Sequence, residues 1–306
     1  MNKYDVIVLG SGPAGLTAAI YTSRAELKTL ILAGNEPGGQ LTTTTDVENF
    51  PGFPEGIMGP ELMTKMIEQS KRFGAELLNQ KADAVEVVNE KEFKVKSGED
   101  EFVASAIILA TGATAKWLGL ESEQRMRGKG VSACATCDGA FFRDKKVVVV
   151  GGGDAAMEEA NYLTKFAKEV IVLVRKKEEE LRASKIMQER AMNNPKVRFI
   201  FSTELKKVLG DQVVTGVKII NIETKEESEL EVQGIFVAIG HKPNTDFLQG
   251  VVDLKKEYVV VRDNTKTSQL GIFAAGDVAD YRYRQAITAA GLGCMAALDV
   301  EKYLAE

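Results

Sequence analysis

Short apolar runs separated by polar segments recur along this chain. Runs such as residues 4–9 and 29–32 are typical of strands that are buried on both faces of a parallel sheet. Amphipathic or small-residue segments stand between the runs, and those at 16–24, 59–73 and 287–304 predict helices. The remaining runs that predict buried strands cover residues 107–113, 146–150, 169–174, 235–240 and 271–277.

A different pattern lies between residues 84 and 103. Three short segments, 84–88, 93–96 and 101–103, are separated by polar turns. Short strands joined by polar turns are typical of an antiparallel sheet. We therefore expect a small antiparallel element before the buried strand that begins at Ile107. A second hairpin is expected between residues 216 and 232.

The order of elements at the start of the chain occurs a second time from residue 146. Each copy has a strand, a glycine-rich turn, a helix and another strand, which is the arrangement of a dinucleotide-binding module. The run at 271–277 resembles one more parallel strand of the first module. We therefore predict an α/β protein with two Rossmann-like dinucleotide-binding domains, the second inserted in the first, each with a small antiparallel β element.

The first glycine-rich turn follows a predicted strand and precedes a predicted helix, and this context makes the motif a strong signal. Its glycines permit a tight turn and a close approach of the backbone to a pyrophosphate. The first N–H groups of the helix then face the phosphates. The candidate cofactor-binding residues of this turn are Gly10, Ser11, Gly12, Pro13, Ala14 and Gly15.

The segment after the second strand departs from the usual dinucleotide pattern, in which an acidic residue binds the adenosine ribose. The nearest acid is Glu36. Either Glu36 binds the ribose, or backbone groups of residues 33–40 do so. The loop itself is either a flexible polar connection or a segment that wraps round a cofactor. Its candidate cofactor-binding residues are Ala33, Glu36, Gly38, Gly39 and Gln40, with Asn49 where the wrapping would end.

The second glycine-rich turn and its helix start supply Gly151, Gly153, Asp154, Ala155 and Ala156 as candidate cofactor-binding residues. The residues after the next strand distinguish the nucleotides. An acid there binds a free ribose 2′-hydroxyl, whereas basic side chains accommodate a 2′-phosphate. The basic residues at this place are Arg175, Lys176, Lys177 and Arg182, and they favour NADP over NAD. The alternative is a solvated charged face, since three glutamates follow at 178–180.

One buried strand near the end of the chain finishes in Gly276 and Asp277, at the edge of the sheet where open α/β proteins bind ligands. A buried carboxylate there can accept a hydrogen bond from a ribityl hydroxyl. Arg284, Gln285 and Ala286 begin the small-residue helix that follows. The N–H groups at the start of this helix can stabilise negative charge on a reduced flavin ring.

Cys134 and Cys137 stand at Cys-x-x-Cys spacing, and Asp138 follows at once. At this spacing one thiolate can attack a disulfide and the second can resolve the adduct, while the neighbouring acid is a candidate to move the proton. The alternative is half of a zinc site, which needs further ligands. The remaining Cys and His, Cys294 and His241, are distant and isolated in the sequence. The redox interpretation is therefore favoured, with Cys294 as a packing residue.

Composition and charge narrow the class of protein. A chain of 306 residues is long enough for two cores, and its net charge of −5 argues against a nucleic-acid partner. No apolar run reaches the ~18 residues of a membrane span. The N-terminus lacks the pattern of a signal peptide. Because a thiol pair that cycles suits a reducing compartment, we expect a cytoplasmic protein.

Taken together, these motifs resemble those of the low-molecular-weight thioredoxin reductases, within the FAD-dependent pyridine nucleotide-disulfide oxidoreductases. The resemblance runs from Tyr4 to Leu304. The motifs that carry it lie at 10–15, 38–40, 134–139, 276–277 and 284–286.

The resemblance implies FAD in a discontinuous domain, residues 1–113 and 243–306, and NADPH in the inserted domain, residues 114–242, which carries the cysteines. It implies a thioredoxin-disulfide reductase, in which hydride passes from NADPH to FAD and electrons pass on to the cysteine disulfide and to thioredoxin. Cys137 would face the flavin, Cys134 would attack the disulfide of thioredoxin, and Asp138 would handle the proton. A homodimer built mainly through the FAD domains and a rotation of one domain against the other are also implied.

One motif departs from this family. Its basic motif usually begins with His and two Arg, where this chain has Arg175, Lys176 and Lys177. Lysine binds phosphate as a point charge and lacks the bidentate fork of arginine, although NADPH remains favoured. Two alternatives stay open. One is a flavin dithiol oxidase or ferredoxin-fed reductase of the same fold, which would not need the basic cluster. The other is a flavin-binding module whose cysteines are structural or regulatory.

Overall fold

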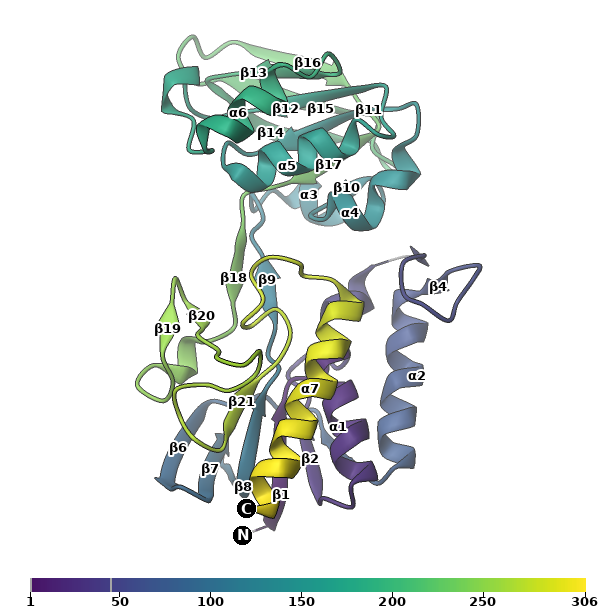
Figure 1. The fold of residues 1–306 in the computed structure, drawn as a ribbon. Coiled ribbons are helices and arrows are strands. Elements are labelled where there is room, and N and C mark those ends of the chain that lie inside the picture. The colour runs from purple at the N-terminus through teal and green to yellow at the C-terminus, as the bar shows by residue number, and fades with distance from the viewer. Residues whose placement is uncertain (1, 45) are drawn as a thin grey trace. The chain divides into compact units, whose positions relative to one another are not determined.

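The computed structural model describes residues 2–44 and 46–306, and Figure 1 shows the course of the chain. The chain divides into two compact units: unit 1, residues 1–114 with 242–306, and unit 2, residues 115–241. It crosses between them twice, in β9 (Ala113–Ala115) and β18 (His241–Pro243), and these two strands pair with each other. In the described ranges, no helix is both long enough and apolar enough to cross a membrane.

The main sheet of unit 1 has the strand order β5-β2-β1-β8-β7-β6, with β21 also paired to β8. Strands β5, β2, β1, β8 and β21 pair in parallel, whereas β6, β7 and β8 form an antiparallel meander. The parallel part is thus completed by a strand from the far end of the chain, beyond unit 2. The strands are β1 (Asn2–Leu9), β2 (Thr29–Leu32), β5 (Glu76–Leu78), β6 (Ala84–Asn89), β7 (Glu92–Ser97), β8 (Asp100–Leu109) and β21 (Ile272–Ala274).

Strand β8 corrects one prediction. The sequence predicts separate strands at 101–103 and from Ile107, but the structure has one continuous strand, Asp100–Leu109. The first half of β8 pairs with β7 on one side, and its last three residues pair with β21 on that same side. Residues 104–106 contain no glycine or proline, and Ala104 and Ala106 pair with β1, so nothing ends the strand between its two partners.

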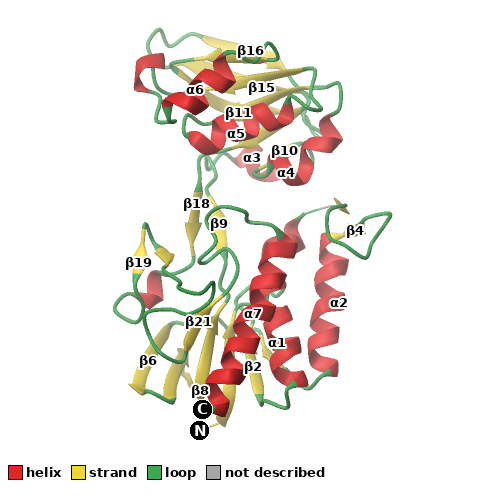
Figure 2. Cartoon of the chain, in the orientation of Figure 1, coloured by secondary structure: helices red, strands yellow, loops and turns green. Residues whose placement is uncertain are grey.

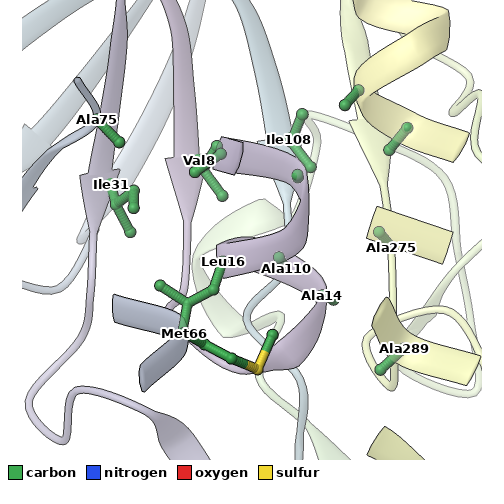
Figure 3. Packing of buried hydrophobic residues seen from close by; sticks show 14 of the residues in the cluster. Val8, Ala14, Leu16, Ile31, Met66, Ala75, Ile108, Ala110, Ala275 and Ala289 are labelled. Atoms are coloured by element: carbon green, nitrogen blue, oxygen red, sulfur yellow. The ribbon is translucent and has the colours of Figure 1, made fainter. Parts of the chain in front are cut away.

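Three helices of unit 1, α1 (Pro13–Arg24), α2 (Gly59–Arg72) and α7 (Ala286–Ala305), lie side by side over this sheet (Figures 1 and 2). Val6 and Val8 of β1 pack with these helices, and the alternate residues of that strand pack on the opposite face. Figure 3 shows Val8 on its strand with Leu16 of α1 and Met66 of α2 in the same cluster.

Helices α1 and α7 are in very close contact. A Cβ atom at Gly293 would lie only 2.1 Å from the carbonyl oxygen of Ala14, so only glycine fits there. Smaller elements complete unit 1: β3 (Asp46–Val47), β4 (Ile57–Met58), β19 (Leu254–Lys255), β20 (Tyr258–Val259) and the 3₁₀ turns η1 (Gly39–Thr43) and η4 (Asp246–Leu248).

Unit 2 is built on a parallel sheet in the order β10-β17-β11-β12-β13. Helices α5 and α6 pack on one face, and the three-stranded antiparallel sheet β14-β15-β16 packs on the other with α3 (Figure 2). The expected hairpin is present as β15 and β16, while β13, β14 and α6 were not predicted. The strands are β10 (Val131–Ser132), β11 (Lys146–Val150), β12 (Glu169–Leu173), β13 (Val197–Ile200), β14 (Thr203–Leu209), β15 (Gly216–Asn221), β16 (Glu227–Glu231) and β17 (Gly234–Val237). The helices are α3 (Glu121–Arg125), α4 (Ala135–Asp138), α5 (Asp154–Leu163) and α6 (Lys185–Met192), with 3₁₀ turns η2 (Gly139–Phe142) and η3 (Glu178–Glu180).

The predicted fold class, two Rossmann-like parallel sheets with small antiparallel elements and one unit inserted in the other, is confirmed.

Candidate active site

Cys134 and Cys137 are joined in a disulfide, with their Cα atoms 5.3 Å apart. Cys134 immediately precedes the short helix α4, and this turn brings the two sulfurs together. The Cys137 amide donates a hydrogen bond to Cys134 Sγ at 3.2 Å. Once the disulfide is opened, that N–H can stabilise negative charge on Cys134 Sγ, which favours a nucleophilic thiolate. Cys137 is exposed and Cys134 is half-buried.

Asp138 is half-buried at the C-terminal end of α4. Burial raises the pKa of its carboxyl above the usual range, and a hydrogen bond from the Ser132 side chain lowers it in part. A carboxyl with a raised pKa holds a proton nearer neutral pH than a surface aspartate does. The Asp138 amide donates to the Cys134 carbonyl at 3.1 Å, so the acid lies on the same turn as the thiol pair. Asp138 can therefore exchange a proton there.

Ser132 is a residue of this site that the sequence analysis missed. It is the last residue of β10, and only 7% of its surface is exposed. Its hydroxyl oxygen accepts a hydrogen bond from the Cys134 amide at 3.0 Å. A polar residue at the end of a buried strand, two positions before the first cysteine, is the signal that would have indicated it.

In unit 1, the first glycine-rich turn has two tightly packed glycines and one open glycine. A Cβ atom at Gly10 would lie 2.2 Å from the Ala110 carbonyl oxygen, and one at Gly15 would lie 2.0 Å from the Gly10 carbonyl oxygen. A Cβ atom at Gly12 would meet no described atom within 4 Å. The backbone is therefore open at Gly12, directly before the helix that begins with Pro13 and Ala14. This arrangement lets a phosphate approach the helix N-terminus closely.

The loop after β2 is tied to this turn by a single hydroxyl. Ser11 Oγ donates to the carbonyl of Ala33 at 2.8 Å and accepts from the Gly38 amide at 2.9 Å. A Cβ atom at Gly39 would lie 3.6 Å from Gly12 Cα, so the loop runs alongside the open glycine. Glu36 is exposed at the outer part of the loop.

Two amide side chains in and after this loop donate hydrogen bonds to other segments of unit 1. Gln40 Nε2 donates to the Ala113 carbonyl, and Asn49 Nδ2 donates to Gln285 Oε1 at 3.3 Å. Gln285 caps α7 together with Thr288, which places the start of that helix, at Ala286, beside Asn49. Arg284, just before the cap, has the positive φ of 48° that few non-glycine residues adopt.

Gly276 and Asp277 lie at the end of β21. A Cβ atom at Gly276 would lie 2.9 Å from Ala14 Cβ, so this segment touches the first glycine-rich turn. Burial, and then the negative charge of Asp280, raise the pKa of Asp277 to about 7, while Arg284 acts in the opposite direction. A half-buried carboxyl favours hydrogen-bond donors as neighbours. The first glycine-rich turn, Ala33, the Gly38–Gly39 segment and Gly276 thus lie together where β1, β2 and β21 end.

In unit 2, the second glycine-rich turn repeats the same pattern. A Cβ atom at Gly151 would lie 2.4 Å from the Ala238 carbonyl oxygen, whereas Gly153 has no described atom within 4 Å of that position. Asp154, Ala155 and Ala156 then form the first turn of α5, and Asp154 Oδ1 accepts from the Ser184 amide at 2.6 Å. The structure therefore has a second open glycine at a helix N-terminus.

The basic residues lie beside this second turn, as expected from their position. The Arg182 amide donates to the Gly152 carbonyl at 3.0 Å, which holds Arg182 next to the glycines. Lys176 Nζ lies 3.1 Å from Glu180, and Lys177 Nζ lies 3.0 Å from Glu223. Over residues 2–44 and 46–306, no ion pair engages Arg175 or Arg182. The four basic residues therefore differ in their ion pairs: both lysines are paired with carboxylates, whereas the two arginines are in no ion pair within the described ranges.

Comparisons with known proteins indicate the family of this chain. The model of the family "pyridine nucleotide-disulphide oxidoreductase" matches residues 4–293. Thioredoxin reductase of Mycolicibacterium smegmatis is 54% identical over 99% of this chain and 97% of that protein. A bifunctional thioredoxin reductase/thioredoxin of Mycobacterium leprae is 50% identical over 99% of this chain and 66% of its own length. The solved thioredoxin reductase of Giardia duodenalis superposes with a TM-score of 0.95 at 42% identity, covering 100% of both chains.

The fold, the two glycine-rich turns and the cysteine pair define a disulfide oxidoreductase, and the chain belongs to the pyridine nucleotide-disulphide oxidoreductase family. Its relatives over nearly the full length make it an enzyme of the thioredoxin reductase type. The resemblance inferred from the motifs is confirmed, and the family implies the use of a flavin and a pyridine nucleotide. The same-fold oxidase and ferredoxin-fed alternatives are not favoured.

Proposed function

We propose that this chain is an NADPH-dependent thioredoxin-disulfide reductase that uses FAD. The observation that carries the proposal is the Cys134–Cys137 disulfide at the start of α4, with the raised-pKa carboxyl of Asp138 on the same turn. A reversible disulfide beside a proton-holding acid has the parts that dithiol exchange with another protein needs.

FAD would bind in unit 1. The fit rests on the open backbone at Gly12, on the loop of Gly38 and Gly39 beside it, and on the half-buried Asp277 carboxyl, which can accept a hydrogen bond from a sugar hydroxyl. The N–H groups at the start of α7 would stabilise negative charge on the ring system. The residues proposed to hold FAD are Gly10, Ser11, Gly12, Pro13, Ala14, Gly15, Ala33, Glu36, Gly38, Gly39, Gln40, Asn49, Gly276, Asp277, Arg284, Gln285 and Ala286.

NADPH would bind in unit 2. The open backbone at Gly153, at the N-terminus of α5, suits a pyrophosphate, and Arg175 and Arg182 suit a 2′-phosphate. Arginine holds phosphate in a bidentate fork, so the two arginines would contribute more than the lysines. The residues proposed to hold NADPH are Gly151, Gly153, Asp154, Ala155, Ala156, Arg175, Lys176, Lys177 and Arg182.

The chain's own thiols would carry the reaction to the protein substrate. FAD and NADPH, when bound, would supply the electron pair with which the Cys134–Cys137 disulfide is reduced to two thiols. The Cys134 thiolate then attacks one sulfur of the thioredoxin disulfide, which forms a mixed disulfide and releases one thioredoxin thiolate. Attack by Cys137 on Cys134 Sγ breaks that bond, restores the enzyme disulfide and releases the second thiolate. The two released thiolates take up two protons, and Asp138 would relay protons between the thiols and water.

Thioredoxin is the proposed protein substrate. The Mycobacterium leprae relative, whose printed name joins thioredoxin reductase with thioredoxin in one protein, supports this choice. A reducing compartment such as the cytoplasm suits the proposed chemistry.

A homodimer is proposed through unit 1, because large apolar side chains are exposed on its helices. Tyr21 of α1 is 38% exposed, and Met295 and Leu298 of α7 are 39% and 50% exposed. An exposed apolar face on helices that otherwise pack tightly is typical of a protein interface.

Turnover with NADPH, NADH and reduced ferredoxin, compared side by side on the FAD-loaded enzyme with thioredoxin as acceptor, tests the proposal. We expect rapid turnover with NADPH and, without oxygen or thioredoxin, bleaching of the flavin absorbance on its addition. A flavin that NADPH leaves unchanged but reduced ferredoxin bleaches would overturn the proposal in favour of a ferredoxin-fed reductase. Turnover of dithiols with oxygen, in the absence of NADPH, would overturn it in favour of an oxidase.

A further inference from the structure

The four basic residues beside the second glycine-rich turn lie on one segment, residues 175–184, which connects β12 with α6. The last part of this segment is bonded to the turn. The carbonyl oxygen of Gly152 accepts two hydrogen bonds there, from the amides of Arg182 and Ala183 at 3.0 and 3.1 Å. The backbone of Arg182 is therefore held next to the glycines.

Gln188 holds the same part of the segment from α6. It lies in the first turn of that helix, and its side chain folds back so that Nε2 donates to the Ala183 carbonyl at 2.7 Å. The Leu181 carbonyl is 3.5 Å from Nε2, which is too long to contribute much. Because the partner is a carbonyl oxygen, only the NH₂ group of the glutamine amide can make this bond. Gln188 is half-buried, which limits the access of water to the bond.

The peptide groups on both sides of Arg182 are thus fixed. Its own amide is bonded to Gly152, and the carbonyl of the next residue, Ala183, is bonded to Gln188. The first end of the segment is held by backbone instead, since the Lys176 carbonyl accepts an amide of the turn before β14 at 3.0 Å. Loss of the Gln188 side chain should therefore loosen the backbone at Arg182 and leave the other end in place.

A fixed backbone matters for an arginine that is to bind a phosphate. The Arg182 side chain is exposed, so it loses conformational entropy when it closes on a ligand. If its backbone were also mobile, that loss would be larger and the affinity lower. The hydrogen bonds around Arg182 remove this additional cost before the ligand arrives.

We propose that Gln188 is a positioning residue for the choice of nucleotide: by holding the Ala183 carbonyl, it keeps Arg182 placed for the 2′-phosphate of NADPH. This inference rests on the proposed function, in which Arg182 binds that phosphate. Gln188 acts through the backbone of residues 182–183 and not on the nucleotide itself. Its loss should therefore weaken the binding of nucleotides that carry a 2′-phosphate and spare those that lack it.

Calorimetric titration of the FAD-loaded enzyme with NADP⁺ and NAD⁺, which do not reduce the flavin, tests the proposal. Gln188→Met keeps the length of the side chain and removes the donor. We expect it to weaken NADP⁺ binding about 2- to 10-fold, the equivalent of one hydrogen bond, and to leave NAD⁺ binding unchanged. An equal loss for both nucleotides would overturn the proposal, since a general loosening of unit 2 would then explain it.

A matched control is available in the same unit. Gln233 Oε1 accepts the Lys146 amide at 3.0 Å, which is also a bond between a glutamine side chain and the backbone, but outside residues 175–184. Gln233→Met should change the affinity for neither nucleotide.

An Arg182→Ala background tests whether Gln188 acts through the arginine. In that background Gln188→Met should weaken NADP⁺ binding no further, because the side chain that it positions is gone. A further loss as large as in the wild type would overturn the positioning role.

The same titrations separate this inference from the proposed function. If the wild type bound NADP⁺ and NAD⁺ equally, the choice of NADPH would fail, and the positioning role would fail with it. If the wild type preferred NADP⁺ and Gln188→Met kept the full preference, only the positioning role would fail.

Discussion

Glu223 holds Lys177 by an ion pair of 3.0 Å between Oε1 and Nζ, although the two residues lie on different elements of unit 2. Glu223 belongs to the turn between β15 and β16, and Lys177 follows β12. Glu180 engages Lys176 in the same way at 3.1 Å. Two carboxylates therefore compete with any phosphate for the lysines of the basic cluster.

Glu223→Gln should tighten NADPH binding. The pair is about half exposed and contributes little by itself, so its loss frees Lys177 for the phosphate and should improve the affinity for NADPH at most a few-fold. NADH lacks the 2′-phosphate and should bind unchanged. Titration calorimetry with both nucleotides measures this. Glu227→Gln, which breaks the Lys218–Glu227 pair on the same antiparallel sheet, is the control and should change neither affinity. Equal gains in both variants would show a general charge effect.

Arg175→Ala and Arg182→Ala should each raise the KM for NADPH. A charge-assisted hydrogen bond to phosphate contributes about 1.5–3 kcal/mol, so one lost contact weakens binding by roughly 10- to 150-fold. Lys176→Ala should have a smaller effect, because Glu180 already engages that lysine. The KM for NADH should stay nearly constant in all three variants. Steady-state kinetics with both nucleotides checks this, and equal use of NADPH and NADH by the wild type would mean that the cluster is only a solvated face.

Cys134→Ser and Cys137→Ser should each keep FAD bound and abolish turnover of thioredoxin, because each leaves a single thiol. Cys137→Ser should in addition trap thioredoxin as a stable mixed disulfide, since Cys134 can attack and nothing resolves the adduct. Non-reducing gel electrophoresis with thioredoxin reads out the trap. Cys137 is the more exposed of the two residues in the oxidised structure. Trapping by Cys134→Ser instead would therefore exchange the two roles.

Asp277→Asn should stabilise the apoprotein above neutral pH and weaken its hold on FAD. Burial raises the pKa of Asp277 from 3.8 to about 7. Between these values the unfolded chain loses its proton first, so wild-type stability falls as the pH rises from about 4 to about 7. The loss amounts to on the order of 4 kcal/mol at most above pH 7, and asparagine avoids it.

Melting temperatures of the apoproteins between about pH 4 and pH 8 check the sign of this prediction. The gain from Asp277→Asn should vanish near pH 4. The exposed carboxylate of Asp263, paired with Lys266, provides the control, and Asp263→Asn should show no such trend. The amount of FAD that Asp277→Asn retains during gel filtration measures the predicted weakening of FAD binding. Undiminished retention would remove Asp277 from the proposed FAD site.

Most of the architecture could be predicted because it depends on local pattern. Apolar runs that end in glycine turns predicted the parallel strands. The glycines at 10, 12 and 15 have a steric role that any sequence of this form would share. Strand β8 was divided because a single sequence does not show that the partner changes from β7 to β21 partway along one strand.

The residues that the sequence did not indicate act through contacts between distant elements. Glu223 reaches the basic cluster from a turn of another sheet, so the sequence near Lys177 does not indicate this ion pair. Ser132 lies close to the cysteines in sequence, yet the hydrogen bond that it accepts from the Cys134 amide depends on its burial at the end of β10, which spacing alone does not reveal. By contrast, a redox-active pair follows from the Cys-x-x-Cys spacing alone, and the structure shows the two cysteines joined in a disulfide at the start of α4.

The pairing of β9 with β18 also bears on how such a chain can be rebuilt. Because unit 2 enters and leaves through neighbouring strands, its two ends lie close together, as in domains that tolerate transplantation between hosts. A short turn could close the cut ends of unit 1, and a different nucleotide-binding unit could be spliced in at the same two points. Unit 2 can in this sense be exchanged as one segment, and recombination at residues 114–116 and 240–242 would leave the main sheet of unit 1 unchanged.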